Sequence, residues 1–178
     1  NVWWSRLISR NFEGAMQVVE QFPDNAQAGP FGINDKTMAR LITLTVMNKD
    51  DSVQALIDDV RRQIDALGPR EETLETMAAL TLAVIAGLEG NTSQAEAYVD
   101  RWLKGAGKDW ADRVLYRDTA CQVLGIADAA DAAVECIRDG LEEPSAIMPF
   151  VETKLPFYDS IREEPVFAEL VEELENQG

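Results

Sequence analysis

The segment from Ala79 to Trp102 constrains the fold of this chain most. It reads ALTLAVIAGLEGNTSQAEAYVDRW, and a Gly-Asn-Thr break at 90–92 divides it into two halves. Small side chains recur at helical spacings in both halves: Ala79, Ala83 and Ala86, then Ala95 and Val99. Because small side chains let helices approach closely, the segment predicts a tightly packed helix pair.

The same organisation extends along the chain. Apolar residues recur with the period of a helix, and Gly, Pro, Asn and Asp residues separate the periodic segments. The pattern predicts four helix pairs, at about 2–22, 35–67, 71–103 and 109–141. A loop is expected at 24–34, where there is no apolar period.

The last segment, 145–176, differs from the pairs. Pro149, Pro156 and Pro165 interrupt it, and Pro165 suits the first turn of a final helix. That helix would turn its apolar residues inward and its acidic residues outward: Val166, Phe167, Leu170, Val171 and Leu174, against Glu169, Glu172, Glu173 and Glu175. A polar outer face is what the end of a helical stack needs, so we expect a cap here.

These patterns resemble the tetratricopeptide repeat. In the third pair, smaller side chains take the W-x2-L-G-x2-Y positions, followed by the A-x3-F positions: Ala79, Leu82-Ala83 and Ala86, then Ala95 and Val99. The second pair departs from the pattern if Ala55 is its small position, because polar Asp59 then stands where a large apolar residue is expected.

The terminal segment resembles a more specific group. LPFYDSIR at 155–162, followed by Pro165-Val166-Phe167, is similar to the closing segment of tetratricopeptide domains in bacterial signalling proteins. Those domains lie C-terminally in adenylate or guanylate cyclases, winged-helix transcriptional regulators and some protein kinases. The resemblance implies an all-α fold over 1–178, a right-handed solenoid of antiparallel helix pairs with a C-terminal capping helix.

The resemblance also implies a function. We expect a non-catalytic protein–protein interaction or regulatory scaffold domain whose partner is a protein or peptide. One alternative is the regulatory C-terminal region of an adenylate or guanylate cyclase, with the catalytic part outside this chain. A second is a module that binds a small apolar ligand. The chain begins at Asn1 without a methionine, and we interpret it as a fragment of a longer protein.

Composition argues against several classes of function. The formal net charge is −16, from 32 acidic and 16 basic residues, and such a field repels phosphate backbones and anionic lipid. We therefore expect no nucleic-acid partner and no direct membrane contact. Histidine, the commonest general base and metal ligand, does not occur in the sequence. We expect no catalytic, cofactor or metal site and no enzymatic activity.

The two cysteines, Cys121 and Cys136, lie in separate predicted helices with apolar neighbours. The preferred interpretation is two buried reduced thiols, because free cysteine behaves as a small hydrophobe. A disulfide across the helix pair is the alternative.

Two candidate interaction sites follow from the pattern. In a tetratricopeptide superhelix the first helices of the pairs line a groove, which here would include Met77, Leu80, Val84 and Leu88. The alternative is that these residues are core. Trp3 and Trp4 are adjacent and so lie about 100° apart on a helix, which leaves one of them available to another molecule. This end is our candidate assembly surface for a homodimer.

Overall fold

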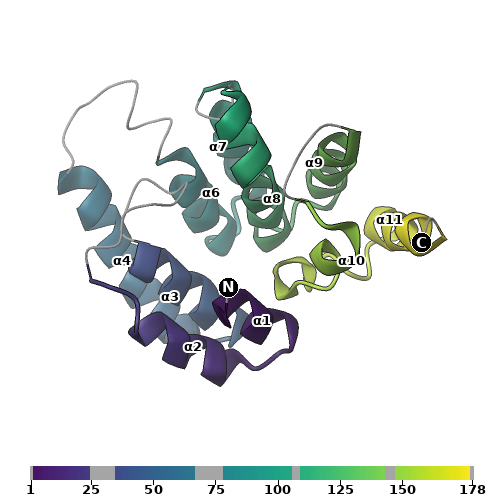
Figure 1. Ribbon diagram of the computed structural model, residues 1–178. Coiled ribbons are helices and arrows are strands. Elements are labelled where there is room, and N and C mark those ends of the chain that lie inside the picture. The colour runs from purple at the N-terminus through teal and green to yellow at the C-terminus, as the bar shows by residue number, and fades with distance from the viewer. Residues whose placement is uncertain (1, 25–34, 67–77, 106–108, 143–146, 177–178) are drawn as a thin grey trace. The chain divides into compact units, whose positions relative to one another are not determined.

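The computed structural model describes residues 2–24, 35–66, 78–105, 109–142 and 147–176. In these ranges the regular structure is helical and no strand occurs, which confirms the all-α prediction (Figure 1). The α-helices are α1 (Val2–Ile8), α2 (Phe12–Glu20), α3 (Asp35–Val46), α4 (Asp50–Ala66), α6 (Ala79–Leu88), α7 (Thr92–Lys104), α8 (Trp110–Ile126), α9 (Ala130–Glu142), α10 (Pro149–Glu152) and α11 (Pro165–Asn176). A short 3-10 helix, η2 (Pro156–Tyr158), lies between α10 and α11. None of these helices has the length and hydropathy that a bilayer span requires.

Contacts group the chain into two compact units, Asn1–Thr81 and Leu82–Gly178, and the division falls inside α6. In the first unit α1 packs on α2, α2 on α3 and α3 on α4. In the second, α7 packs on α8, α8 on α9 and α9 on α11, while α8 also contacts η2. Packing between neighbouring elements is characteristic of stacked helix pairs.

Each described helix pair turns at the same backbone corner. The corner residue has a positive φ, and the described residues contain four of them: Arg10 (58°), Asn48 (54°), Gly90 (74°) and Asp128 (60°). The N–H after each corner donates to a carbonyl of the preceding helix: Asn11 to Arg6 (2.9 Å), Lys49 to Leu44 (3.1 Å), Asn91 to Ala86 (2.8 Å) and Ala129 to Leu124 (3.0 Å). This is the Schellman pattern of helix termination, and it recurs about every 40 residues.

Each corner is followed by two buried residues four positions apart on the second helix. The first is Ala in three pairs and Val in the second pair, and the second is a β-branched residue in all four: Ala15 and Val19, Val53 and Ile57, Ala95 and Val99, Ala133 and Ile137. The two buried positions therefore lie at the same distance from the corner in every described pair.

The second pair follows this rule, which corrects its expected register. Ala55 is exposed, and Asp59 is half-buried and accepts hydrogen bonds from Arg62 and Gln63. Val53 and Ile57 occupy the two core positions instead. Relative to the corner at Asn48, Val53 and Ile57 therefore hold the positions that Ala95 and Val99 hold relative to Gly90.

Glycine permits close approach between successive parts of the second unit. A Cβ at Gly87, near the end of α6, would lie 2.6 Å from Cα of Ala127, beyond the end of α8. The same pair of corners is joined by the Thr92 hydroxyl, which donates to the Ala127 carbonyl at 2.9 Å. At Gly125 in α8, a Cβ would overlap the ring of Tyr158 in η2.

The final helix begins at Pro165, as the proline predicts. Its buried residues are Phe167, Leu170 and Leu174, and Val166 and Val171 are half-buried. The acidic residues of the expected outer face are exposed: Glu169, Glu172, Glu173 and Glu175. The helix thus packs its apolar side on α9 and α10 and leaves a charged side to water.

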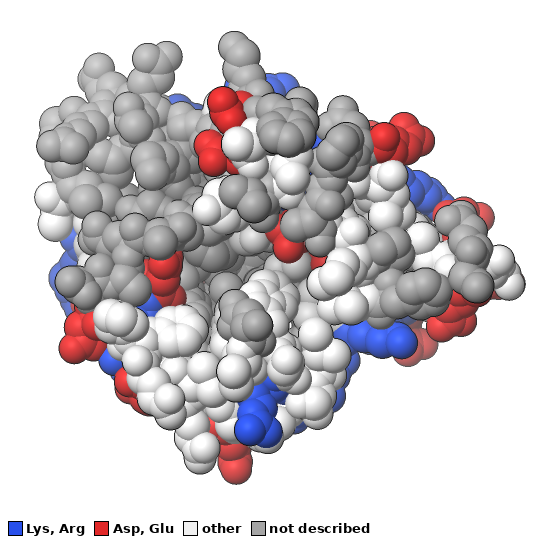
Figure 2. Space-filling model, in the orientation of Figure 1, with Lys and Arg blue, Asp and Glu red and all other residues white. Residues whose placement is uncertain are grey.

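Some expected features lie outside the described residues. These are the loop at 25–34 and the beginning of the third pair up to 77. On the face shown in Figure 2, acidic and basic side chains of the described residues are interspersed.

Candidate functional site

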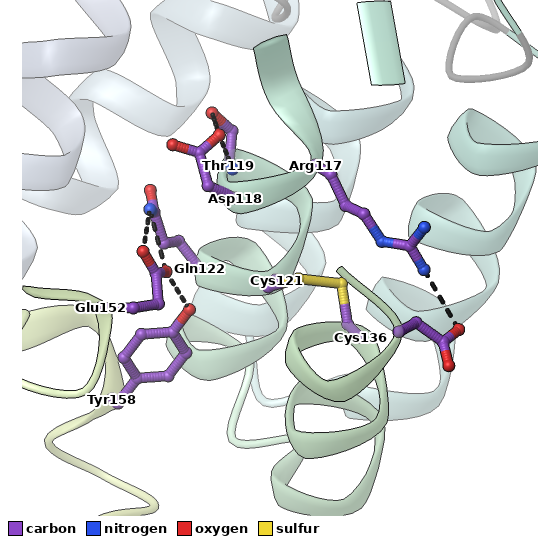
Figure 3. The surroundings of a disulfide bond; sticks show 9 residues. Arg117, Asp118, Thr119, Cys121, Gln122, Cys136, Glu152 and Tyr158 are labelled. Atoms are coloured by element: carbon purple, nitrogen blue, oxygen red, sulfur yellow. Dashed lines mark hydrogen bonds and ion pairs between the residues drawn. A yellow bond between two sulfur atoms is a disulfide. The ribbon is translucent and has the colours of Figure 1, made fainter. Parts of the chain in front are cut away.

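A buried polar cluster joins α8 to the segment that follows α9 (Figure 3). The hydroxyl of Tyr158 donates to Oε1 of Glu152 at 2.5 Å. The amide Nε2 of Gln122, in α8, donates to both Glu152 oxygens, at 3.0 and 3.4 Å. Glu152 is only 3% exposed and Tyr158 is fully buried, so a carboxyl group is held in the interior by donors from two elements.

Burial is the main influence on the acidity of this cluster. It raises the pKa of Glu152 to about 7. The hydrogen bonds from Tyr158 and Gln122 lower this pKa, and the charge of Asp118 raises it. Burial, followed by the neighbouring Glu152 charge, raises the pKa of Tyr158 well above its ordinary value. The tyrosine therefore remains a neutral donor, whereas Glu152 changes charge near neutral pH.

Asp118 lies one helical turn before Gln122 on α8. Burial raises its pKa, although the backbone N–H of Thr119 donates to its Oδ1 at 2.7 Å. The charge of Asp118 in turn disfavours the charged form of Glu152.

Beside this cluster, a disulfide joins α8 to α9. The bond joins the sulfur atoms of Cys121 and Cys136, and these two residues are 0% and 5% exposed. The prediction of burial is confirmed, and the preferred interpretation of reduced thiols is wrong. The alternative interpretation, a disulfide across the helix pair, is correct. The α8–α9 hairpin brings the two cysteine Cα atoms to within 5.4 Å of each other, which is in the range that a disulfide requires.

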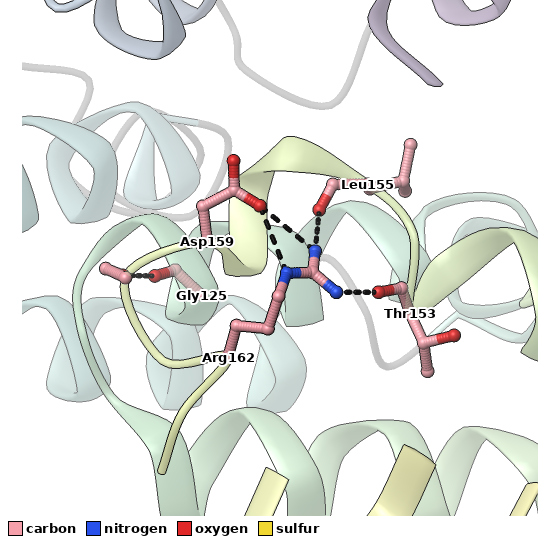
Figure 4. Close-up of polar contacts among 6 residues, drawn as sticks. Gly125, Thr153, Leu155, Asp159 and Arg162 are labelled. Atoms are coloured by element: carbon pink, nitrogen blue, oxygen red, sulfur yellow. Dashed lines mark hydrogen bonds and ion pairs between the residues drawn. The ribbon is translucent and has the colours of Figure 1, made fainter. Parts of the chain in front are cut away.

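Arg162 braces the loop that carries Tyr158 (Figure 4). Its guanidinium donates to the carbonyl of Thr153 at 2.8 Å and to that of Leu155 at 3.1 Å, and it forms an ion pair with Asp159 at 3.0 Å. The hydroxyl of Ser160 then ties this loop to the Gly125 carbonyl of α8 at 3.2 Å. The Tyr-Asp-Ser-Ile-Arg stretch thereby positions η2 on α8.

We predict that Arg162→Lys lowers the free energy of unfolding by about 2 kcal/mol. A lysine ammonium is a point charge and cannot span two carbonyls and a carboxylate as the planar guanidinium does. Urea denaturation followed by circular dichroism measures the loss.

Arg138→Lys is the matched control for this substitution. Arg138 pairs with Glu173 at 2.9 Å, and both side chains are 43% exposed. An exposed pair contributes about 0–1 kcal/mol, so this variant should differ little from wild type. Equal losses in the two lysine variants would contradict the bracing role of Arg162.

The predicted groove residues have different surroundings. Leu80 and Val84 are 0% exposed, and Leu88 is half-buried. Met77 lies outside the described residues. The groove stays a prediction, for which Leu88 offers the accessible side chain.

The two tryptophans of the predicted assembly surface also differ in exposure. Trp3 is buried, and its indole N–H donates to the Thr43 hydroxyl of α3 at 3.0 Å. Trp4 is half-buried, with its ring centre 5.4 Å from that of Trp3 in an edge-on arrangement. Of the pair, Trp4 is therefore the more exposed, and self-association stays a prediction.

Sequence reasoning missed Gln122, Glu152 and Tyr158 as a cluster. Glu152 is a lone acid in the segment Met148–Leu155, and Gln122 is a polar residue next to the apolar residues Ala120, Cys121, Val123 and Leu124 of α8. These polar residues in apolar surroundings are the available signal. Gln122 and Glu152 lie 30 positions apart, however, and meet only in the folded chain.

Among the described residues, no cluster of His, Cys, Asp or Glu is arranged to hold a metal ion. Comparison with protein-family models, curated proteins and solved structures finds no match to this chain.

Proposed function

We propose that this chain is a tetratricopeptide-like, right-handed α-solenoid with a C-terminal cap, serving as a non-catalytic interaction scaffold in a bacterial signalling protein. The observation that supports it is the corner repeated at Arg10, Asn48, Gly90 and Asp128, with the same pair of buried residues after each. Repetition of one helix pair is how solenoids build extended binding surfaces. The interval of about 40 residues exceeds the tetratricopeptide length of about 34, so the repeated unit is longer here.

The buried acid also fits a scaffold better than an active site. Glu152 is 3% exposed, and its donors are Gln122 and Tyr158 from neighbouring elements of the same unit. A general acid or base must reach its substrate. We therefore assign Glu152 to the joint between α8 and the cap.

In this scaffold a protein partner would bind against the first helices of the pairs. Leu88, at the end of α6, is the described groove residue with partial exposure. Ala97 is exposed on α7, the second helix of the same pair, and serves as a matched position.

A photoreactive amino acid placed at position 88 or 97 of the full-length protein, in the cells that produce it, tests this function. We expect a discrete cross-linked protein from position 88 and none from position 97. The captured protein, once purified, should bind the chain in calorimetry, and Leu88→Asp should weaken that binding about tenfold or more. Equal labelling from both positions, or no binding by the purified protein, would overturn the proposal.

A further inference from the structure

The fourth helix pair departs from the second and third at two positions of its first helix, of which the first is half-buried and the second is buried in this pair. The positions are matched by their distance from the corner residue. They hold the apolar residues Met38 and Ile42 in the second pair and Leu80 and Val84 in the third. In the fourth pair they hold the polar residues Asp118 and Gln122. Buried polar residues destabilise a core unless they are partnered. A local break in a repeated pattern is where a special role is expected.

The partner of Gln122 comes from the segment after α9, whereas Asp118 accepts a hydrogen bond from Thr119 of its own helix. We call the contact of Gln122 and Gly125 with Glu152 and Tyr158 the cap joint. Gln122 and Tyr158 both donate to the Glu152 carboxyl, and the Tyr158 ring lies directly over Gly125. The cap is thus attached through a buried ionisable group, whereas the equivalent contact at Gly87 is made by the methyl group and backbone of Ala127.

The charged groups around the joint do not neutralise Glu152. From α8 the nearby charge is Asp118, which has the same sign. In the loop after η2, Arg162 is engaged with Asp159 and two carbonyls. The acids of α11 are exposed, and Lys154 is exposed on the segment itself.

We propose that the cap joint is a proton-controlled latch, which holds the C-terminal cap on α8 while Glu152 is neutral and opens more often once Glu152 has lost its proton. The cap comprises α10, η2 and α11. Opening would uncover the α8 and α9 surface on which η2 and α11 lie.

The direction of the pH effect follows from the two environments of Glu152. In the docked cap burial raises its pKa to about 7, and in an opened joint the carboxyl would return toward its ordinary value of 4.5. The docked state therefore binds the proton more tightly. The stabilisation of the docked state is fully present below pH 4.5 and is lost as the pH rises through about 7.

Hydrogen exchange of the full chain, measured by mass spectrometry at pH 6 and pH 8 and corrected for intrinsic rates, tests the latch. We expect the opening constant of peptides from Met148–Asn176 to rise about tenfold between these pH values. Peptides from α7 should show no such rise. Glu152→Gln should abolish the rise in the cap, because the amide does not titrate.

Two further variants make the test specific. Glu172→Gln makes the same chemical change at an exposed position of α11 and should keep the tenfold rise. Tyr158→Phe removes a donor to the carboxylate and should increase opening more at pH 8 than at pH 6. A cap that opens equally at both pH values, a rise that survives Glu152→Gln, or an equal effect of Tyr158→Phe at both pH values would each overturn the proposal.

Discussion

Gly125→Ala should lower the free energy of unfolding of the second unit by about 3 kcal/mol. The added Cβ would overlap the ring of Tyr158 and lie 2.7 Å from the carbonyl oxygen of Phe157. Neither neighbour can easily give way. The Tyr158 ring stacks on Phe167 at 5.2 Å between centroids and is tied by its hydroxyl to Glu152, while the Phe157 contact is backbone. We therefore expect η2 to be displaced from α8.

The measurement is urea denaturation followed by circular dichroism. Gly90→Asn is the matched control, because a Cβ at Gly90 meets nothing within 4 Å and asparagine tolerates the positive φ of 74°. It should cost only a few tenths of a kcal/mol. If Gly125→Ala is as stable as this control, the close packing of η2 on α8 is wrong.

Much of the helical organisation was predictable because its signals are local. Apolar periodicity depends on neighbours within a turn or two, and Pro165 marks the start of α11 by its own chemistry. The register of the second pair was harder, since the small side chain of Ala55 is misleading when read without its corner. Asn48, a residue type that tolerates positive φ, sets that register and was the better signal.

The cap joint and the disulfide depend on contacts that no local pattern contains. Gln122 and Glu152 are 30 residues apart, and their contact requires η2 to approach α8 over the missing side chain of Gly125. Cys121 and Cys136 lie on different helices, so their pairing follows only once the corner at Asp128 fixes how α8 and α9 face each other. Apolar neighbours predict burial of a cysteine but not its oxidation state.

Reducing the Cys121–Cys136 disulfide should lower the free energy of unfolding by about 3 kcal/mol. The bond closes a loop with a sequence separation of 15, and it restricts the unfolded chain by tethering α8 to α9. This hairpin also carries η2 and α11, so its loss should extend to the cap. Urea midpoints with and without dithiothreitol measure the effect.

The double variant Cys121→Ala/Cys136→Ala separates the bond from general effects of the reductant. Its urea midpoint should be low and should not change with dithiothreitol, whereas that of the wild type should fall toward it. Because the two cysteines are 0% and 5% exposed, reduction should also be slow in native buffer and fast in urea, where the α8–α9 hairpin opens. An unchanged wild-type midpoint under reducing conditions would mean that packing alone, without the bond, holds this hairpin together.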